Sequence, residues 1–88
     1  MNGGISQAAV EEELYAMLAE SRGSTVAAVR AAVGGSGEID SLEGVELIVA
    51  AEERYGVTVA DDELPQVCTA IPRLAELVAS KIASVGTS

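Results

Sequence analysis

The chain has 88 residues, which is enough for one small domain and excludes a multidomain enzyme. Its 14 acidic residues outnumber 5 basic ones, giving a net charge of −9 that disfavours nucleic acid and anionic membranes as partners and favours proteins with basic patches. A hydrophobic content of 49%, rich in Ala, Leu and Val, is too high for an acidic disordered tail, so we expect a folded helical monomer.

The first predicted helix covers residues 6–20, where Val10, Leu14 and Leu18 recur at the spacing of one helix face. A short valine-rich helix capped by Ser24 is expected to follow. Three glycines within the next four residues then predict a flexible loop, because glycine loses the most conformational freedom on ordering.

The strongest helix signal lies between Asp40 and Tyr55. Asp40 is a candidate N-cap, and Glu43 stands three residues later, where a capping box places its acid. Gly56 follows as a C-terminal stop. This segment is therefore predicted to be the central helix of the fold.

The last third of the chain predicts a connector, one helical turn and a final helix. Residues 57–59 are an extended connector, because no second strand exists to pair with them. Residues 61–64 form a turn that Pro65 ends, and Thr69 caps the last helix, with Pro72 in its first turn. The buried stripe of that helix is expected to consist of Ile71, Leu74, Leu77, Val78 and Ile82. These elements predict an all-α fold, a small three-to-four-helix bundle.

The expected layout is a single domain over residues 6–83, between a flexible leader at 1–5 and a flexible tail at 84–88. Cys68 is the sole cysteine, so no internal disulfide can form. The start of the chain lacks the pattern of a secretion signal, and no apolar run approaches the about 18 residues that span a bilayer. We therefore expect a cytoplasmic protein without membrane contacts.

The residue inventory excludes most enzymatic sites. The chain has no histidine, so neither a Ser-His-Asp triad nor a Cys-His pair can form. The acids Asp61, Asp62 and Glu63 are typical of a solvated helix start, so no metal site is predicted. We expect a protein on which enzymes act, not an enzyme.

The central helix carries apolar and acidic side chains together on the face opposite its core stripe. If this face were buried in the bundle, its glutamates would lose their water without gaining basic partners. A docking surface for basic, partly apolar partners is the favoured interpretation, and Leu42 is one of the apolar residues on it. The predicted recognition residues are Glu43, Val45, Glu46, Val49, Glu52, Glu53 and Val59.

Ser41 directly follows the expected N-cap, behind the glycine loop and at the edge of the mixed face. It could be an ordinary serine of a first helical turn. However, an anion attached to its hydroxyl would lie at the positive end of the helix dipole, close to the first-turn N–H groups. Ser41 is therefore a candidate modification site.

One set of residues resembles the acyl carrier proteins: Asp40-Ser41-Leu42, Val45-Glu46-Leu47, Glu52-Glu53 and Tyr55-Gly56. The resemblance extends over residues 40–82, about half of the chain. It implies a four-helix carrier domain in which Ser41, flanked by Asp40 and Leu42, bears a covalent 4′-phosphopantetheine from coenzyme A. The thiol of that arm would hold acyl groups as thioesters and shuttle them between enzymes of fatty-acid or polyketide-type biosynthesis.

The implied partners are a phosphopantetheinyl transferase and acyl-loading and acyl-processing enzymes with basic docking patches. An acid at Asp40 is more similar to the free-standing acyl carriers than to the peptidyl carriers, which commonly have a histidine before the serine. The family usually has a Leu-Gly pair just before Asp-Ser-Leu. Ser36-Gly37-Glu38-Ile39 occupies this stretch here, so a looser loop is expected.

Two alternatives stay open at this point. One is a carrier of aminoacyl or peptidyl groups. The other is a small acidic helical interaction module without a prosthetic group, in which Ser41 would be phosphorylated instead.

Overall fold

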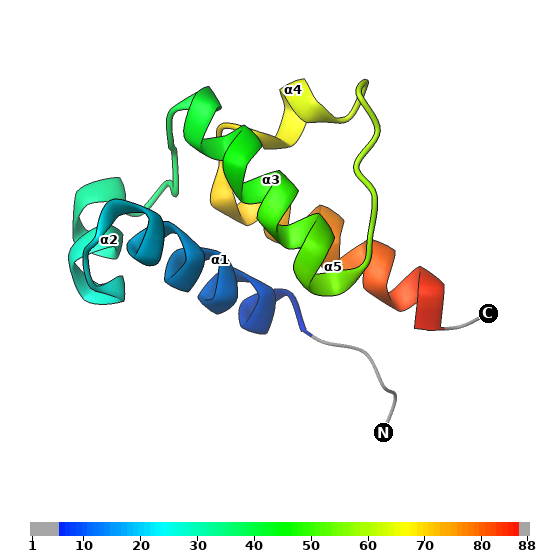
Figure 1. The fold of residues 1–88 in the computed structure, drawn as a ribbon, viewed down its shortest axis with the longest axis horizontal. Helices are drawn as coiled ribbons and strands as arrows, with labels where there is room; N and C mark the ends of the chain where they lie inside the picture. Colours follow the sequence, from blue (N-terminus) through cyan, green and yellow to red (C-terminus); the bar gives the residue numbers. More distant parts are fainter. Residues whose placement is uncertain (1–5, 87–88) are drawn as a thin grey trace.

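The computed structural model describes residues 6–86 and has the all-α architecture that the sequence predicts (Figure 1). Within these residues the helices are α1 (Gln7–Arg22), α2 (Val26–Val33), α3 (Ser41–Tyr55), α4 (Leu64–Val67) and α5 (Ile71–Gly86). The predicted leader, 1–5, lies outside the described residues.

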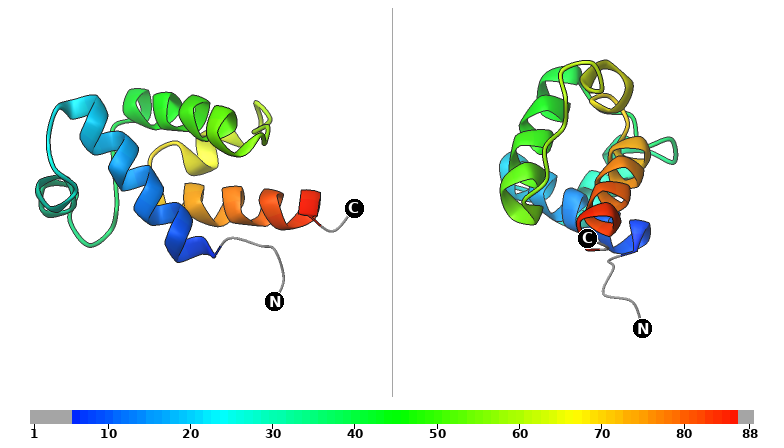
Figure 2. Two further views of the ribbon diagram at one scale, coloured as in Figure 1. Left: turned by 60° about the horizontal axis from the view of Figure 1, so that its bottom comes forward. Right: turned by 90° about the vertical axis from the view of Figure 1, so that its right-hand side faces the viewer.

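The bundle is organised around α1, which contacts α2, α3 and α5, while the short α4 packs on α5. Helices α3 and α5 extend in the same general direction, and α1 crosses them in the opposite sense (Figure 2). The side chains that fill the interior include Val10, Leu14 and Leu18 of α1, Val29 of α2, Leu47 and Ile48 of α3, and Ile71, Leu74 and Val78 of α5. The middle of α3 therefore packs on the core, while its first residues lie at the surface.

Helices α1 and α2 begin with hydroxyl caps. The Ser6 Oγ accepts a hydrogen bond from the Ala9 N–H at 3.1 Å, which confirms the predicted start of the first helix. For α2 the predicted cap is wrong by one residue: the Thr25 Oγ1 accepts from the Ala28 N–H at 3.1 Å, while Ser24 precedes it. A capping hydroxyl bonds an N–H two or three residues later, and Thr25 is the residue in that register.

Helix α3 has the predicted ends but lacks the predicted capping box. Asp40 is the N-cap residue, yet its side chain makes no capping hydrogen bond. Glu43 does not cap either, because the guanidinium of Arg22 binds its carboxylate. At the other end Gly56 has φ 68°, and its N–H donates to the Glu52 carbonyl at 2.9 Å, as expected for a glycine stop.

Two boundaries in the last third differ from the prediction. Pro65 lies in the first turn of α4, which begins at Leu64, instead of ending a turn, because a proline in the first helical turn forfeits no helical hydrogen bond. Helix α5 begins at Ile71, two residues after the predicted cap Thr69, with Pro72 in its first turn as expected. It continues to Gly86, so the segment 84–86 is helical where a tail was predicted.

The connector over residues 57–60 has no regular secondary structure, as predicted. Val57 and Val59 are each only 7% exposed, so the connector covers the core although it forms no strand. The stripe of α5 is also confirmed, since Ile71, Leu74 and Val78 are fully buried and the two other predicted residues pack against the core.

Candidate functional site

Ser41 is the first residue of α3 and is exposed to solvent. Asp40 and Leu42 beside it are also exposed, and the Leu42 side chain shows 67% of its surface. The Asp40 carboxylate leaves the first-turn N–H groups uncapped. An exposed hydroxyl next to uncapped N–H groups suits a phosphate ester, because the N–H groups and the helix dipole both favour negative charge there.

The loop before Ser41 is tied to the corner between α4 and α5. The Ile39 N–H donates to the Thr69 carbonyl and the Ile71 N–H donates to the Gly37 carbonyl, both at 2.9 Å. These bonds belong to an isolated antiparallel bridge. The end of the loop is thus fixed by backbone hydrogen bonds, although the sequence led us to expect a looser entry into the helix.

Gly44 brings the first turns of α3 against the same corner. A Cβ atom at this position would lie 1.4 Å from the carbonyl oxygen of Cys68, so no side chain fits. Gly44 lies on the buried side of α3 with Leu47, Ile48 and Ala51, where the absence of a side chain lets another element approach closely. Ser41 therefore lies one turn from a tight backbone contact.

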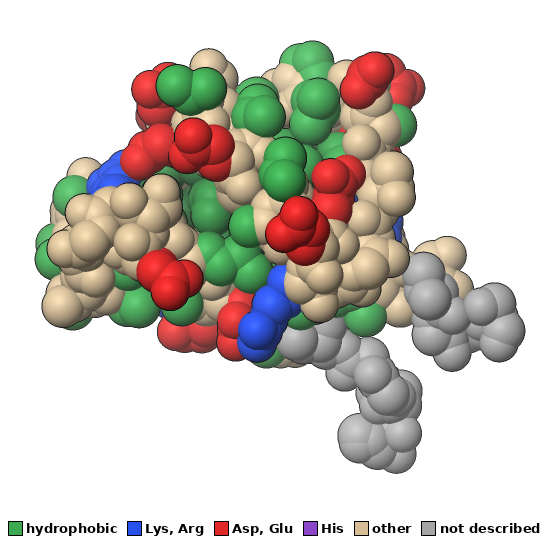
Figure 3. Space-filling model, in the orientation of Figure 1, with side chains coloured by type: hydrophobic (Ala, Val, Ile, Leu, Met, Phe, Trp, Pro, Cys, Tyr) green, Lys and Arg blue, Asp and Glu red, His purple; other side chains and the backbone are tan. Residues whose placement is uncertain are grey.

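The mixed face of α3 is exposed. Leu42, Val45 and Val49 are the large apolar side chains with high exposure, at 67%, 39% and 50%. Glu46 and Glu53 are exposed as well and form no ion pair within the described part of the chain. Apolar and acidic patches alternate over this side of the molecule (Figure 3). The alternative in which both faces of the helix are buried is therefore wrong.

Three of the predicted recognition residues are engaged within the fold. Glu43 accepts two hydrogen bonds from Arg22, and these bonds lower the pKa of its carboxyl. The Glu52 Oε2 accepts from the Val59 N–H at 2.8 Å and so fixes the connector. Val59 itself is buried, so its side chain is not accessible to a partner. From here on, the docking face means Leu42, Val45, Glu46, Val49 and Glu53.

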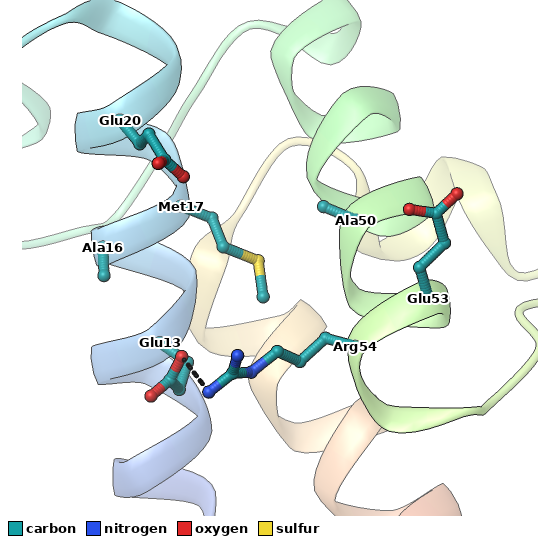
Figure 4. Close-up of a pocket in the computed structure, with 7 residues that line it drawn as sticks. All are labelled: Glu13, Ala16, Met17, Glu20, Ala50, Glu53 and Arg54. Carbon is teal, nitrogen blue, oxygen red and sulfur yellow. Dashed lines mark ion pairs between the residues drawn. The ribbon is translucent and has the colours of Figure 1, made fainter.

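A groove of about 390 Å³ lies between α1 and α3 (Figure 4). Met17 projects into it, and an ion pair between Arg54 and Glu13 at 3.2 Å connects the two helices across one end. Its lining residues are Glu13, Ala16, Met17, Glu20, Ala50, Glu53 and Arg54. Sequence reasoning missed this groove; the small side chains Ala16 and Ala50 are the signal, but they leave a hollow only once α1 and α3 are side by side.

Most of the basic side chains form ion pairs with acidic side chains of the same chain. The ion pairs of the described residues are Arg22–Glu43, Arg30–Glu12, Arg54–Glu13 and Lys81–Glu63. In addition, the Arg30 guanidinium lies 4.1 Å from the centre of the Tyr15 ring. None of these pairs includes Glu46 or Glu53, so the charge of the docking face is not cancelled locally.

In the residues that the structure describes, no helix is long and apolar enough to cross a membrane. The same part of the chain brings together no group of three or more His, Cys, Asp or Glu side chains that could hold a metal ion.

A comparison with curated proteins finds a protein named acyl carrier protein from Acidothermus cellulolyticus, 50% identical over 32 residues. The match covers 36% of this chain and 38% of that protein, so the chain spans well under half the length of the relative that it matches. No protein family model matches the chain, and no solved structure does.

Proposed function

We propose that this chain is an acyl carrier protein in which Ser41 bears a 4′-phosphopantetheine arm. The observation that carries the proposal is the exposed Ser41 hydroxyl at the start of α3, where the Asp40 side chain leaves the first-turn N–H groups uncapped. The partial identity to a protein named acyl carrier protein supports the same conclusion.

Attachment would join the Ser41 oxygen to the phosphorus of the arm in a phosphodiester, while the pyrophosphate bond of coenzyme A breaks, adenosine 3′,5′-bisphosphate leaves and the hydroxyl proton is released. The first-turn N–H groups would then face this phosphate, and the dipole of α3 would stabilise its charge. When bound, the arm supplies a thiol that holds acyl groups as thioesters. The chain itself has to present Ser41 to its partners and keep the arm at the surface.

The docking face would bring the partner enzymes to Ser41. It begins next to the serine with Leu42 and continues along α3 with Glu46 and Val49. Acids that are not neutralised attract basic patches and speed the encounter, and exposed apolar side chains gain free energy when a partner covers them. We therefore propose a transferase and acyl-processing enzymes with basic, partly apolar surfaces as the partners.

Mass spectrometry of transferase reactions tests the proposal. The unmodified chain and the variants Ser41→Ala and Ser36→Ala are incubated with coenzyme A and a broad-specificity phosphopantetheinyl transferase, and the intact masses are measured. Ser36 is a matched control, because it is an exposed serine in the loop before α3. We expect the wild type and Ser36→Ala each to gain one arm and Ser41→Ala to gain none. An arm on Ser41→Ala would rule out Ser41 as the site.

A further inference from the structure

An ion pair connects the end of α1 to the first turn of α3. We propose that Arg22 is a positioning residue, which acts through Glu43 to hold Ser41 in the geometry that the transferase requires. This proposal rests on the proposed function, since it concerns how fast Ser41 is modified. It also gives Glu43 a role inside the chain instead of the partner contact that the sequence predicts.

The pair has a geometry that restricts motion. The Arg22 Nε donates to the Glu43 Oε2 and the Arg22 Nη2 donates to the Glu43 Oε1, each at 2.7 Å. Two parallel hydrogen bonds fix the carboxylate in both distance and orientation. The side chains of Arg22 and Glu43 are 31% and 26% exposed, so water competes less for them than it does for a fully exposed pair.

The first turn of α3 needs such support, because its own cap is missing. Asp40 forms no side-chain capping bond, and uncapped helix ends fray. Gly44 holds this turn on one side, through its close contact with the Cys68 backbone. Arg22 holds it from α1 through Glu43, which is only two residues after Ser41. Loss of Arg22 would leave the turn supported on one side.

The geometry also argues against Glu43 as a partner contact. Both of its carboxylate oxygens already accept hydrogen bonds from Arg22, so a basic side chain of an enzyme would have to displace a paired guanidinium. The two roles predict opposite effects. If Glu43 binds partners, removal of Arg22 frees an acid and speeds modification; if Arg22 positions Ser41, its removal slows modification.

The rate of modification of Ser41 decides between these roles. The variants are Arg22→Gln, Glu43→Gln, the double variant, and Arg22→Lys, which keeps the charge. Arg30→Gln is the control, because it removes the same charge from another 2.7 Å ion pair, which joins α2 to α1 and does not involve α3.

We expect each glutamine variant at the Arg22–Glu43 pair to lower kcat by about threefold to fivefold, the upper range for a partly exposed pair. The double variant should be no slower than the slower single one, because both substitutions remove the same interaction. Arg22→Lys should recover part of the rate, and Arg30→Gln should leave it unchanged. Since Arg22→Gln and Glu43→Gln change the net charge in opposite directions, a shared loss cannot come from the overall electric field.

Hydrogen exchange of the unmodified variants separates positioning from global stability. In Arg22→Gln we expect faster exchange at the Gly44 amide, whose N–H donates to the Asp40 carbonyl at 2.9 Å and closes the first turn of α3, with the protection of the α5 core unchanged. Faster exchange throughout α5 would overturn the proposal, because the pair would then only stabilise the fold. A rate for Arg22→Gln equal to or above wild type would also overturn it. If the wild type gained no arm at all, the proposed function would fail, and the positioning role with it.

Discussion

Gly44 is the residue where the packing around Ser41 tolerates least change. A Cβ atom there would meet the Cys68 carbonyl oxygen at 1.4 Å, so Gly44→Ala must displace α3 or the corner between α4 and α5. We expect this variant to lose about 3 kcal/mol of unfolding free energy, at the upper end for overpacking. Chemical denaturation followed by circular dichroism measures the loss.

Gly35→Ala is the control for this substitution. Gly35 has no atom within 4 Å of an added Cβ and does not have a positive φ, so alanine should change the unfolding free energy by less than about 0.5 kcal/mol. Equal stability of the two alanine variants would contradict the close contact at Gly44.

For single residues, the sequence predicts which side of a helix a side chain lies on. It does not predict contacts between residues that are far apart in the chain. The exposure of Leu42 and the inward position of Gly44 follow from the spacing along α3. The pairing of Glu43 with Arg22 joins residues 21 positions apart, and no local pattern indicates it. The burial of Val59 likewise depends on how the connector packs on the core, so the sequence predicts an exposed partner contact at a residue that the fold buries.

Among the elements, α3 carries the proposed docking face, and charge reversal at Glu46 tests this proposal. Glu46→Lys should slow modification of Ser41 several-fold at low salt, because Glu46 is exposed and not paired within the fold. The effect should shrink as salt rises, since exposed charges are screened over about 8 Å at physiological ionic strength. Transfer rates measured across a salt series check this.

Glu76→Lys controls for net charge in that experiment. Glu76 is an exposed acid on α5, outside the docking face, and its reversal changes the net charge by the same amount. We expect its effect to be clearly smaller than that of Glu46→Lys. Equal transfer rates for the two variants would contradict this position of the docking face. So would a transfer rate that changes neither with salt nor with Glu46→Lys.

A helix can be predicted from the sequence when many apolar residues recur at helical spacing along it. Helices α1, α3 and α5 each show several apolar residues at helical spacing, and the structure has all of them. The short elements depend on single residues with two possible meanings. A proline can end a turn or stand in a first helical turn, and at Pro65 the packing of α4 on α5 selects the helical turn.

For the whole molecule, the net charge of −9 predicts a fold that salt stabilises. The four ion pairs within the described residues neutralise part of the acids, and the remaining acids repel one another across a small domain. Monovalent salt should therefore raise the melting temperature. Calcium at matched ionic strength should add nothing further, because the described residues contain no cluster that could bind it. Thermal melts followed by circular dichroism in low salt, high salt and calcium check both statements.

A melting temperature that does not change with salt would show that self-repulsion is minor. The negative charge would then act in partner attraction alone. An extra stabilisation by calcium would instead reveal a carboxylate site that this fold does not display.

The most direct test of the account is the mass of the chain as its own organism makes it. Top-down mass spectrometry of the intact protein measures any added group, and fragmentation assigns the group to a residue. We predict the mass of one 4′-phosphopantetheine, with or without an acyl group, on the fragment that contains Ser41. A bare phosphate on Ser41 or a population without any addition would contradict the carrier role, and an arm on another residue would contradict Ser41 as its site.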